Sequence, residues 1–240
     1  MTKNDVKTGV SVAASWAWGT SLILGMQIAQ QKGLCAWAVW ASANTLALTL
    51  FGALTRSGLL GRCMFGHRAI RGMALVIQAF CLIIQMNIIH AVLCDLGVSA
   101  HGAYALAAAT GWIFTLAMYR HGLAASIRTD CWQWAVVMVC VIAIIGMGLA
   151  GQAPCISFPR SSRADLLWAA WSACILLSGP IGDMQHWQRA EAAGRGTAFY
   201  WGSFFFGLYM LMVLFMAQFP FTAFMRVLLL FAVLAVTSST

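Results

Sequence analysis

Long apolar runs constrain this chain more than any other feature of its sequence. Val136–Leu149 and Leu228–Val236 contain no charged residue and are apolar on every face, unlike the alternating strands of a membrane β-barrel. Charged residues make up only 8% of the 240 residues, against roughly 25% in a soluble domain, and the mean hydropathy is +0.84. So little charge cannot solvate a globular surface. The sequence therefore predicts an all-α membrane protein whose side chains mostly face lipid.

The apolar runs are long enough for seven or eight spans of about 20 residues each. No cleavable signal peptide is visible, so the first span is expected to act as its own insertion signal. The connections are too short to fold separately, and the whole chain, 1–240, is predicted to be one transmembrane domain. The predicted spans are 10–31, 34–55, 72–94, 98–118, 131–150, 165–184, 198–217 and 222–240.

Lysine and arginine predict the orientation of these spans. With a cytoplasmic N-terminus, ten basic residues lie inside (Lys3, Lys7, Arg56, Arg62, Arg68, Arg71, Arg120, Arg128, Arg189 and Arg195). Only Lys32, Arg160 and Arg163 lie outside, with Arg226 near the outer end of the last span. The positive-inside rule thus predicts a cytoplasmic N-terminus in a plasma or inner membrane. The net charge of +8 is a topology signal rather than a nucleic-acid surface.

Cysteine and histidine give little sign of metal or catalytic chemistry. The eight cysteines form no CxxC pair and mostly fall in apolar runs, where cysteine acts as a small hydrophobe. The five histidines are scattered among loops and span ends, so no catalytic constellation is expected and the chain is predicted not to be an enzyme.

Two predicted spans contain residues that weaken a helix. The sixth contains Ser178–Asp183, with two glycines and a proline, and the first contains the polar stretch Ser15–Ser21. The predicted topology makes these spans antiparallel and five helices apart, the arrangement expected of an inverted five-helix repeat. Paired broken helices point to a transporter site. More ordinary interpretations are a proline kink, tryptophan packing, and an Asp183 that ends a helix and pairs with Arg189.

At these residues the sequence resembles the sodium/solute symporter family, in particular its urea active transporter branch. The similar stretches are Ala14–Gly19 (ASWAWG), Asp183–Ala190 (DMQHWQRA) and Ala235–Ser239 (AVTSS). The second departs from the branch's D-Q-x-Y-W-Q-R-A at Met184 and His186. The resemblance implies a LeuT-like inverted-repeat core, with the first five-helix repeat and part of the second in this chain. The chain would then be a fragment of such a transporter, or one half of a split transporter whose remaining core helices a second chain supplies.

The resemblance also implies a function and a set of site residues. The function is cation-coupled transport of a small polar solute such as urea, with Na⁺ as the ion and H⁺ as the alternative. The implied Na⁺ ligands are the carbonyls of Ala14, Ala17 and Ala235 and the side chains of Ser238 and Ser239. The expected solute-binding residues are Trp16, Trp18, Thr20, Asp183 and Trp187.

The third span carries two amides on one face. Gln78 and Gln85 are seven residues apart, and they could bind a solute such as urea, or form ordinary interhelical hydrogen bonds. The alternative to transport is a membrane sensor or assembly subunit that uses the same scaffold without transporting.

Overall fold

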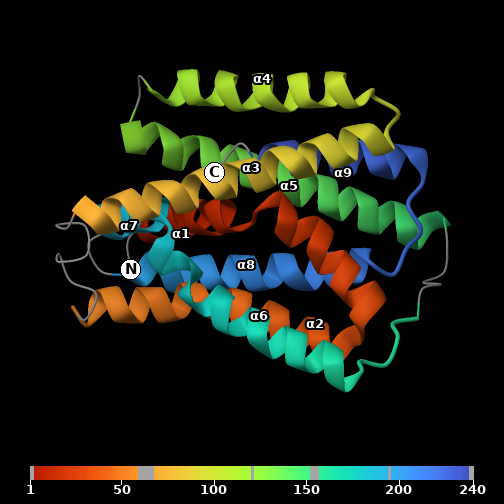
Figure 1. Ribbon diagram of the computed structural model, residues 1–240, viewed down its shortest axis with the longest axis horizontal. Coiled ribbons are helices and arrows are strands. Elements are labelled where there is room, and N and C mark those ends of the chain that lie inside the picture. Colours follow the sequence, from red (N-terminus) through yellow and green to blue (C-terminus); the bar gives the residue numbers. More distant parts are fainter. Residues whose placement is uncertain (1–2, 59–67, 120–121, 152–156, 194–195, 238–240) are drawn as a thin grey trace.

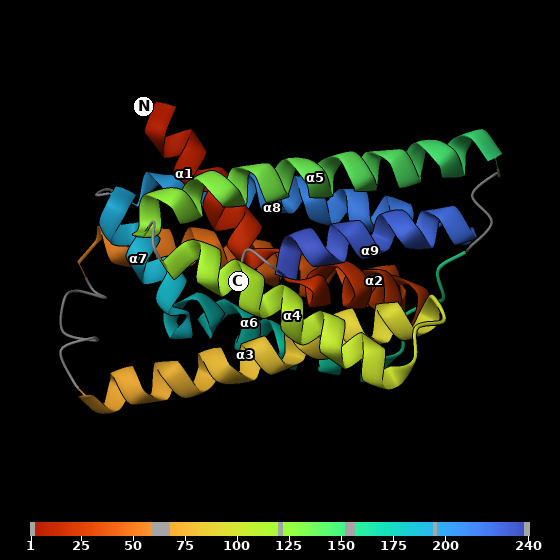
Figure 2. The ribbon, with the colours of Figure 1, turned by 90° about the horizontal axis from the view of Figure 1, so that it is seen from above.

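The computed structural model describes residues 3–58, 68–119, 122–151, 157–193 and 196–237, whose regular structure is entirely α-helical. Figures 1 and 2 show the long helices α3, α4, α5 and α8 lying roughly along one common direction. In chain order they are α1 (Lys3–Trp16), α2 (Gly19–Arg56), α3 (Arg68–Asp95), α4 (Ala100–Tyr119), α5 (Gly122–Gly151), α6 (Arg163–Gly182), α7 (Met184–Ala193), α8 (Thr197–Met216) and α9 (Ala223–Thr237).

Five helices among the described residues are long and apolar enough to cross a membrane: α2, α3, α5, α6 and α8. The helix α9 is apolar but shorter. Large apolar side chains stay exposed along these helices, as expected where they face lipid (Phe80, Val139, Trp171, Leu211 and Phe231 are examples). The prediction of a multi-pass helical membrane protein is confirmed at this level. The orientation of the N-terminus stays a prediction.

The helix α2 contains the second part of the first predicted span, 10–31, and all of the second, 34–55. Gly33 has φ 84° and ψ 171°, a conformation that favours glycine, and it divides α2 into two arms. Figure 1 shows these arms running in opposite directions. A Cβ at Gly33 would lie 2.1 Å from the Pro159 carbonyl oxygen, so the turn also needs a residue without a side chain.

The centre of the molecule is formed where α1, α2 and α8 pack together. Small residues allow close approach: a Cβ on Gly9 of α1 would lie 2.4 Å from Cβ of Trp201, and one on Gly202 of α8 would lie 2.5 Å from Val12. Two further helices pack beside this centre. The helix α6 packs against α2, and α5 packs against α1 and α9. The helix α4 lies at the periphery, next to α3 (Figure 1).

Candidate functional site

The first interruption separates α1 from α2 at Ala17 and Trp18. Trp18 has extended backbone angles (φ −63°, ψ 157°), and regular helix resumes at Gly19. The Trp18 indole N–H donates to the Ser15 carbonyl at 2.9 Å. The Gly19 N–H donates to the side-chain oxygen of Gln85, on α3, at 3.1 Å. Backbone that leaves a helix inside a bilayer must find such partners or line a cavity, so this break is supported by the surrounding packing.

The second interruption separates α6 from α7 at Asp183 (φ −95°, ψ 110°). The Trp187 indole N–H donates to the Ile181 carbonyl at 2.9 Å, near the end of α6. The Asp183 carboxylate accepts the backbone N–H of Gln185 at 2.9 Å, which satisfies a donor at the start of α7. The sixth span is therefore discontinuous, but only at Asp183. The prediction of an interruption over residues 178–183 is wrong for most of that stretch, because the helix continues through Pro180 to Gly182.

The two interruptions lie against each other. Figure 1 shows α1 and α6 running in opposite senses. The ring of Trp16, the last residue of α1, meets the ring of His186 edge-on, with centroids 5.2 Å apart. A Cβ on Gly179 of α6 would lie 2.6 Å from the Trp16 ring, so glycine allows this contact. The sixth span thus approaches the first beside its interruption, as expected from the sequence.

The two glutamines of α3 each reach one interruption. Gln85 accepts the Gly19 N–H at the first, and the Gln78 amide donates to Asp183 Oδ1 at 2.8 Å at the second. Their spacing of seven residues places both on one face of α3, as predicted. Both make hydrogen bonds to other helices, so the ordinary interpretation of these amides describes the structure. No contact with a solute is needed to explain them.

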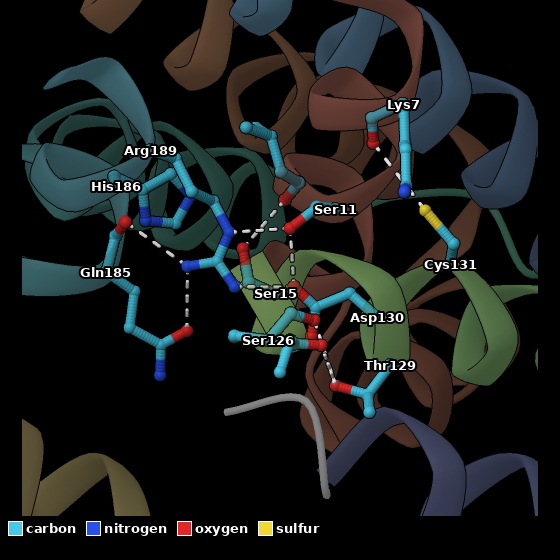
Figure 3. A network of polar contacts seen from close by, with 12 residues as sticks. Lys7, Ser11, Ser15, Ser126, Thr129, Asp130, Cys131, Gln185, His186 and Arg189 are labelled. Atoms are coloured by element: carbon cyan, nitrogen blue, oxygen red, sulfur yellow. Dashed lines mark hydrogen bonds and ion pairs between the residues drawn. The ribbon is translucent and has the colours of Figure 1, made fainter. Parts of the chain in front are cut away.

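A buried charged network links α7 to α1 and α5 (Figure 3). The Arg189 guanidinium donates to Asp130 at 2.6 Å and to the Ser11 hydroxyl at 2.8 Å. Ser11 in turn donates to the same Asp130 oxygen at 2.5 Å. Arg189 also donates to the backbone carbonyl of Gln185 at 3.1 Å. The Arg189 and Asp130 side chains are only 1% and 2% exposed. Each charge therefore compensates the other, because an unpaired buried charge carries a large desolvation cost.

Ser11 and Asp130 were not among the predicted site residues. The predicted fifth span begins at residue 131, whereas α5 begins at Gly122, so Asp130 lies inside a helix rather than in a loop. The charged Arg128 suggested that this segment was a loop. In the structure both residues are helical: the Arg128 side chain is exposed, whereas the Asp130 side chain points inward and pairs with Arg189. The available signal was an isolated acidic residue beside an apolar run.

The suggested ion pair between Asp183 and Arg189 is also wrong. Arg189 pairs with Asp130, and Asp183 pairs with His186, whose Nδ1 lies 2.7 Å from Asp183 Oδ2. The helical geometry explains the difference. His186 is one turn beyond Asp183 and returns to it, whereas Arg189 continues toward α1 and α5.

The implied cation ligands lie partly within the described residues. Ala14 and Ala17 are buried beside the first interruption, and the Ala17 carbonyl has no hydrogen-bond partner among the residues described. The end of α9 reaches the same place, because a Cβ on Gly19 would lie 3.1 Å from the Thr237 methyl group. The neighbouring Ala235 is half-buried on α9.

Ser238 and Ser239 lie outside the described residues, so their distance from the alanine carbonyls stays a prediction. No group of three or more histidine, cysteine, aspartate or glutamate side chains suited to a metal is found in the described part of the chain. The predicted Na⁺ site uses carbonyl and hydroxyl oxygens and none of these side chains.

The expected solute-binding residues lie around the two interruptions. Trp16 is buried, and its indole N–H donates to the Asn44 carbonyl at 2.9 Å. Thr20 lies half-buried in the first turn of α2, and Trp187 lies half-buried on α7. With Trp18 and Asp183, these residues form two groups that meet through the Trp16 and His186 rings.

Comparisons of this chain with family models, with curated proteins and with solved structures give no match. The family resemblance therefore stays a prediction based on the three short stretches of sequence. The geometry of the two interruptions is the independent basis for a functional proposal.

Proposed function

We propose that this chain is a cation-coupled secondary transporter of a small polar solute such as urea, or the portion of one that holds its binding sites. One observation carries the proposal: two interrupted helices, α1–α2 and α6–α7, run in opposite senses and meet at their interruptions. Discontinuous helices in corresponding positions are where such transporters bind ions and solutes. The resemblance to the sodium/solute symporter family supports the same proposal.

The proposed ion site is the first interruption. Sodium would bind the carbonyls of Ala14, Ala17 and Ala235 and the hydroxyls of Ser238 and Ser239. Two facts support this site: the Ala17 carbonyl has no partner among the described residues, and the end of α9 lies against Gly19. One Na⁺ moving down about 100 mV supplies about 2.3 kcal/mol, enough for roughly fifty-fold accumulation of a neutral solute.

The proposed solute site lies between the interruptions, near Trp16, Trp18, Thr20, Asp183 and Trp187. Binding there would change the contact that the Trp16 ring of α1 makes with Gly179 of α6 and His186 of α7.

The buried pair of Arg189 and Asp130 would act on one side of this site. With the proposed cytoplasmic N-terminus, the pair would hold α1, α5 and α7 together on the cytoplasmic side of the interruptions. Its separation would accompany opening to that side. Any missing core helices would come from a second chain.

A second candidate is a membrane sensor or assembly subunit that does not transport. The observation that favours it is that several polar groups at the interruptions already bond one another. Gln78, Gln85 and Asp183 all have protein partners, as expected where interruptions serve structure rather than a solute.

Uptake by proteoliposomes tests the transport proposal. We expect an inward sodium gradient to drive accumulation of radiolabelled urea, and Asp183→Asn to reduce the initial rate at least tenfold. Asp95→Asn is the matched control, because Asp95 is exposed and pairs only loosely with Arg226, at 3.5 Å. Thermal unfolding in sodium chloride and in choline chloride gives a second measurement, independent of any partner chain. Absence of both sodium-driven uptake and sodium-dependent stabilisation would contradict the proposal.

Replacing both Ser238 and Ser239 by alanine tests the ion site separately. We expect the sodium dependence of uptake, or of stability, to be lost. If the double variant keeps the same sodium dependence as the parent chain, the assignment of these ligands is wrong.

A further inference from the structure

His186 occupies the contact between the two interruptions. Its side chain is 0% exposed, and its Nδ1 lies 2.7 Å from Asp183 Oδ2. A carboxylate at that distance accepts a hydrogen bond, so Nδ1 carries a proton whether the ring is neutral or charged. The state of the ring then depends on its second nitrogen, Nε2.

The Nε2 atom is buried without a hydrogen-bond partner among the described residues. Three aromatic rings surround the imidazole, those of Trp16, Phe51 and Phe199, with centroids 5.2, 6.1 and 6.0 Å away. The one polar hydrogen on these rings, the Trp16 indole N–H, donates to the Asn44 carbonyl instead. A neutral ring would therefore bury an unsatisfied acceptor. A protonated Nε2 would present a positive N–H to aromatic π electrons, which attract cations.

The fixed charges of the cluster around His186 also favour one more proton. The acidic group in contact with the imidazole is Asp183, just beyond the end of α6, and a second carboxylate, Asp130 on α5, belongs to the same cluster through Arg189 on α7. Besides His186, Arg189 is the one basic group that pairs with either carboxylate among the described residues, and it pairs with Asp130 rather than with Asp183. The helices α2 and α8 contribute Phe51 and Phe199, which carry no charge, and α1 contributes Trp16 and Ser11.

From α3 the cluster is faced by neutral groups, the Gln78 amide and the Cys81 thiol. Two carboxylates and one guanidinium sum to minus one, and an unbalanced charge is costly in a buried site. One further positive charge would balance the cluster.

We propose that this charge is a proton bound at Nε2 of His186, which makes the contact between the interruptions a buried proton-binding site. Atoms balance simply: the proton comes from water, the imidazole becomes an imidazolium, and Asp183 stays ionised as its partner. The site goes beyond the proposed function, since proton binding requires neither transport nor sodium. In a transporting chain, separation of α1 from α6 would uncover His186 and let the proton leave.

Nitrogen NMR of ¹⁵N-histidine-labelled protein in lipid nanodiscs tests the proposal. An unperturbed imidazole is only about one-tenth protonated at about pH 7.5. We expect one of the five histidines to carry protons on both ring nitrogens at that pH, and this signal to vanish in His186→Asn. His101→Asn is the matched control, because His101 is exposed, and it should leave the signal in place. A neutral ring at His186 at about pH 7.5 would overturn the proposal.

Two further measurements keep the test decisive. If His186→Asn does not fold, single replacement of the other four histidines assigns the remaining signal by elimination. Asp183→Asn removes the partner carboxylate, so the His186 ring should become neutral at about pH 7.5; an unchanged imidazolium would contradict the charge-balance argument. The two proposals can fail separately. A neutral His186 in a chain that shows sodium-driven uptake would contradict only the proton site. A protonated His186 in a chain without uptake would contradict only the transport proposal.

Discussion

The two interruptions meet the same physical requirement with different chemistry. Each has a tryptophan whose indole donates to a carbonyl of the preceding helix, Trp18 at the first and Trp187 at the second. At the first, the N-terminus of the following helix is satisfied by the neutral amide of Gln85. At the second it is satisfied by the carboxylate of Asp183, within a cluster that also contains His186 and Arg189.

This difference suggests different tasks. Neutral oxygens bind a monovalent cation weakly enough to release it, so the first interruption suits reversible binding of such an ion. Buried charges cost several kcal/mol when separated from their partners, so the charged interruption suits a contact held in a defined arrangement. Substitutions that remove charge should therefore have large effects at the second interruption, while the first should respond only to changes in hydrogen bonding and packing.

The largest expected effect comes from Arg189→Ala. This change leaves Asp130 buried without its ion-pair partner, and removing one member of a buried pair typically costs about 3–5 kcal/mol. Thermal unfolding in detergent should show a large fall in the midpoint. Arg226→Ala is the matched control, because that arginine pairs with Asp95 at 3.5 Å on the surface, and exposed pairs contribute only about 0–1 kcal/mol.

A double variant separates charge from packing in the same place. Replacing Arg189 by Met and Asp130 by Leu together removes both charges, so it should recover most of the stability lost in Arg189→Ala. A double variant as unstable as the single one would mean that shape, rather than charge compensation, explains the effect.

The next effect concerns the contact between the interruptions. Gly179→Ala places a Cβ 2.6 Å from the Trp16 ring, which is held in place by its bond to Asn44. Overpacking of this kind costs typically about 1–3 kcal/mol, and the unfolding midpoint should fall accordingly. Gly146→Ala is the control, because no atom lies within 4 Å of a Cβ there and alanine favours a helix. Equal midpoints for the two variants would show that α1 and α6 do not pack as described.

The positions of the interruptions could be predicted from the sequence, but their partners could not. Glycine, proline and polar residues stand out against an apolar background, so Ser15–Ser21 and Ser178–Asp183 were recognisable locally. The partners come from distant helices: Gln85 is 66 residues from Gly19, and Asp130 is 59 residues from Arg189. Periodicity predicts which face of a helix a side chain occupies, not which helix packs against that face.

The glutamines of α3 illustrate the same limit in one helix. Their spacing of seven residues predicted that Gln78 and Gln85 share a face, and both do point toward the interruptions. Whether an amide at such a position binds a solute or a helix end depends on the tertiary arrangement of α1, α6 and α3. The proposed cation ligands Ser238 and Ser239 came from the family resemblance alone, and they lie outside the described residues.

A smaller effect distinguishes these two glutamines. Gln85→Leu leaves the Gly19 N–H without that acceptor, and an unsatisfied buried donor costs about 1–3 kcal/mol. Gln78→Leu removes one bond to Asp183, which still accepts from Gln185 and His186, so its cost should be nearer the roughly 0.6 kcal/mol typical of an interhelical hydrogen bond. Unfolding midpoints of the two variants, measured together, check this order. The reverse order would mean that the neutral interruption depends less on α3 than the charged one.

The last expected effect, also a small one, tests the feature that the interruptions share. Trp18→Phe and Trp187→Phe each remove an indole N–H and leave the Ser15 or Ile181 carbonyl without that donor. The aromatic ring is largely retained, so each change should cost about 0.5–1.5 kcal/mol, the net value of one hydrogen bond. We expect similar falls in the unfolding midpoint for the two variants, because the donor, the acceptor and the 2.9 Å distance are the same. A Trp187→Phe effect several times larger than that of Trp18→Phe would show that the charged cluster depends on this indole for its position, and that the two interruptions differ even in the element they have in common.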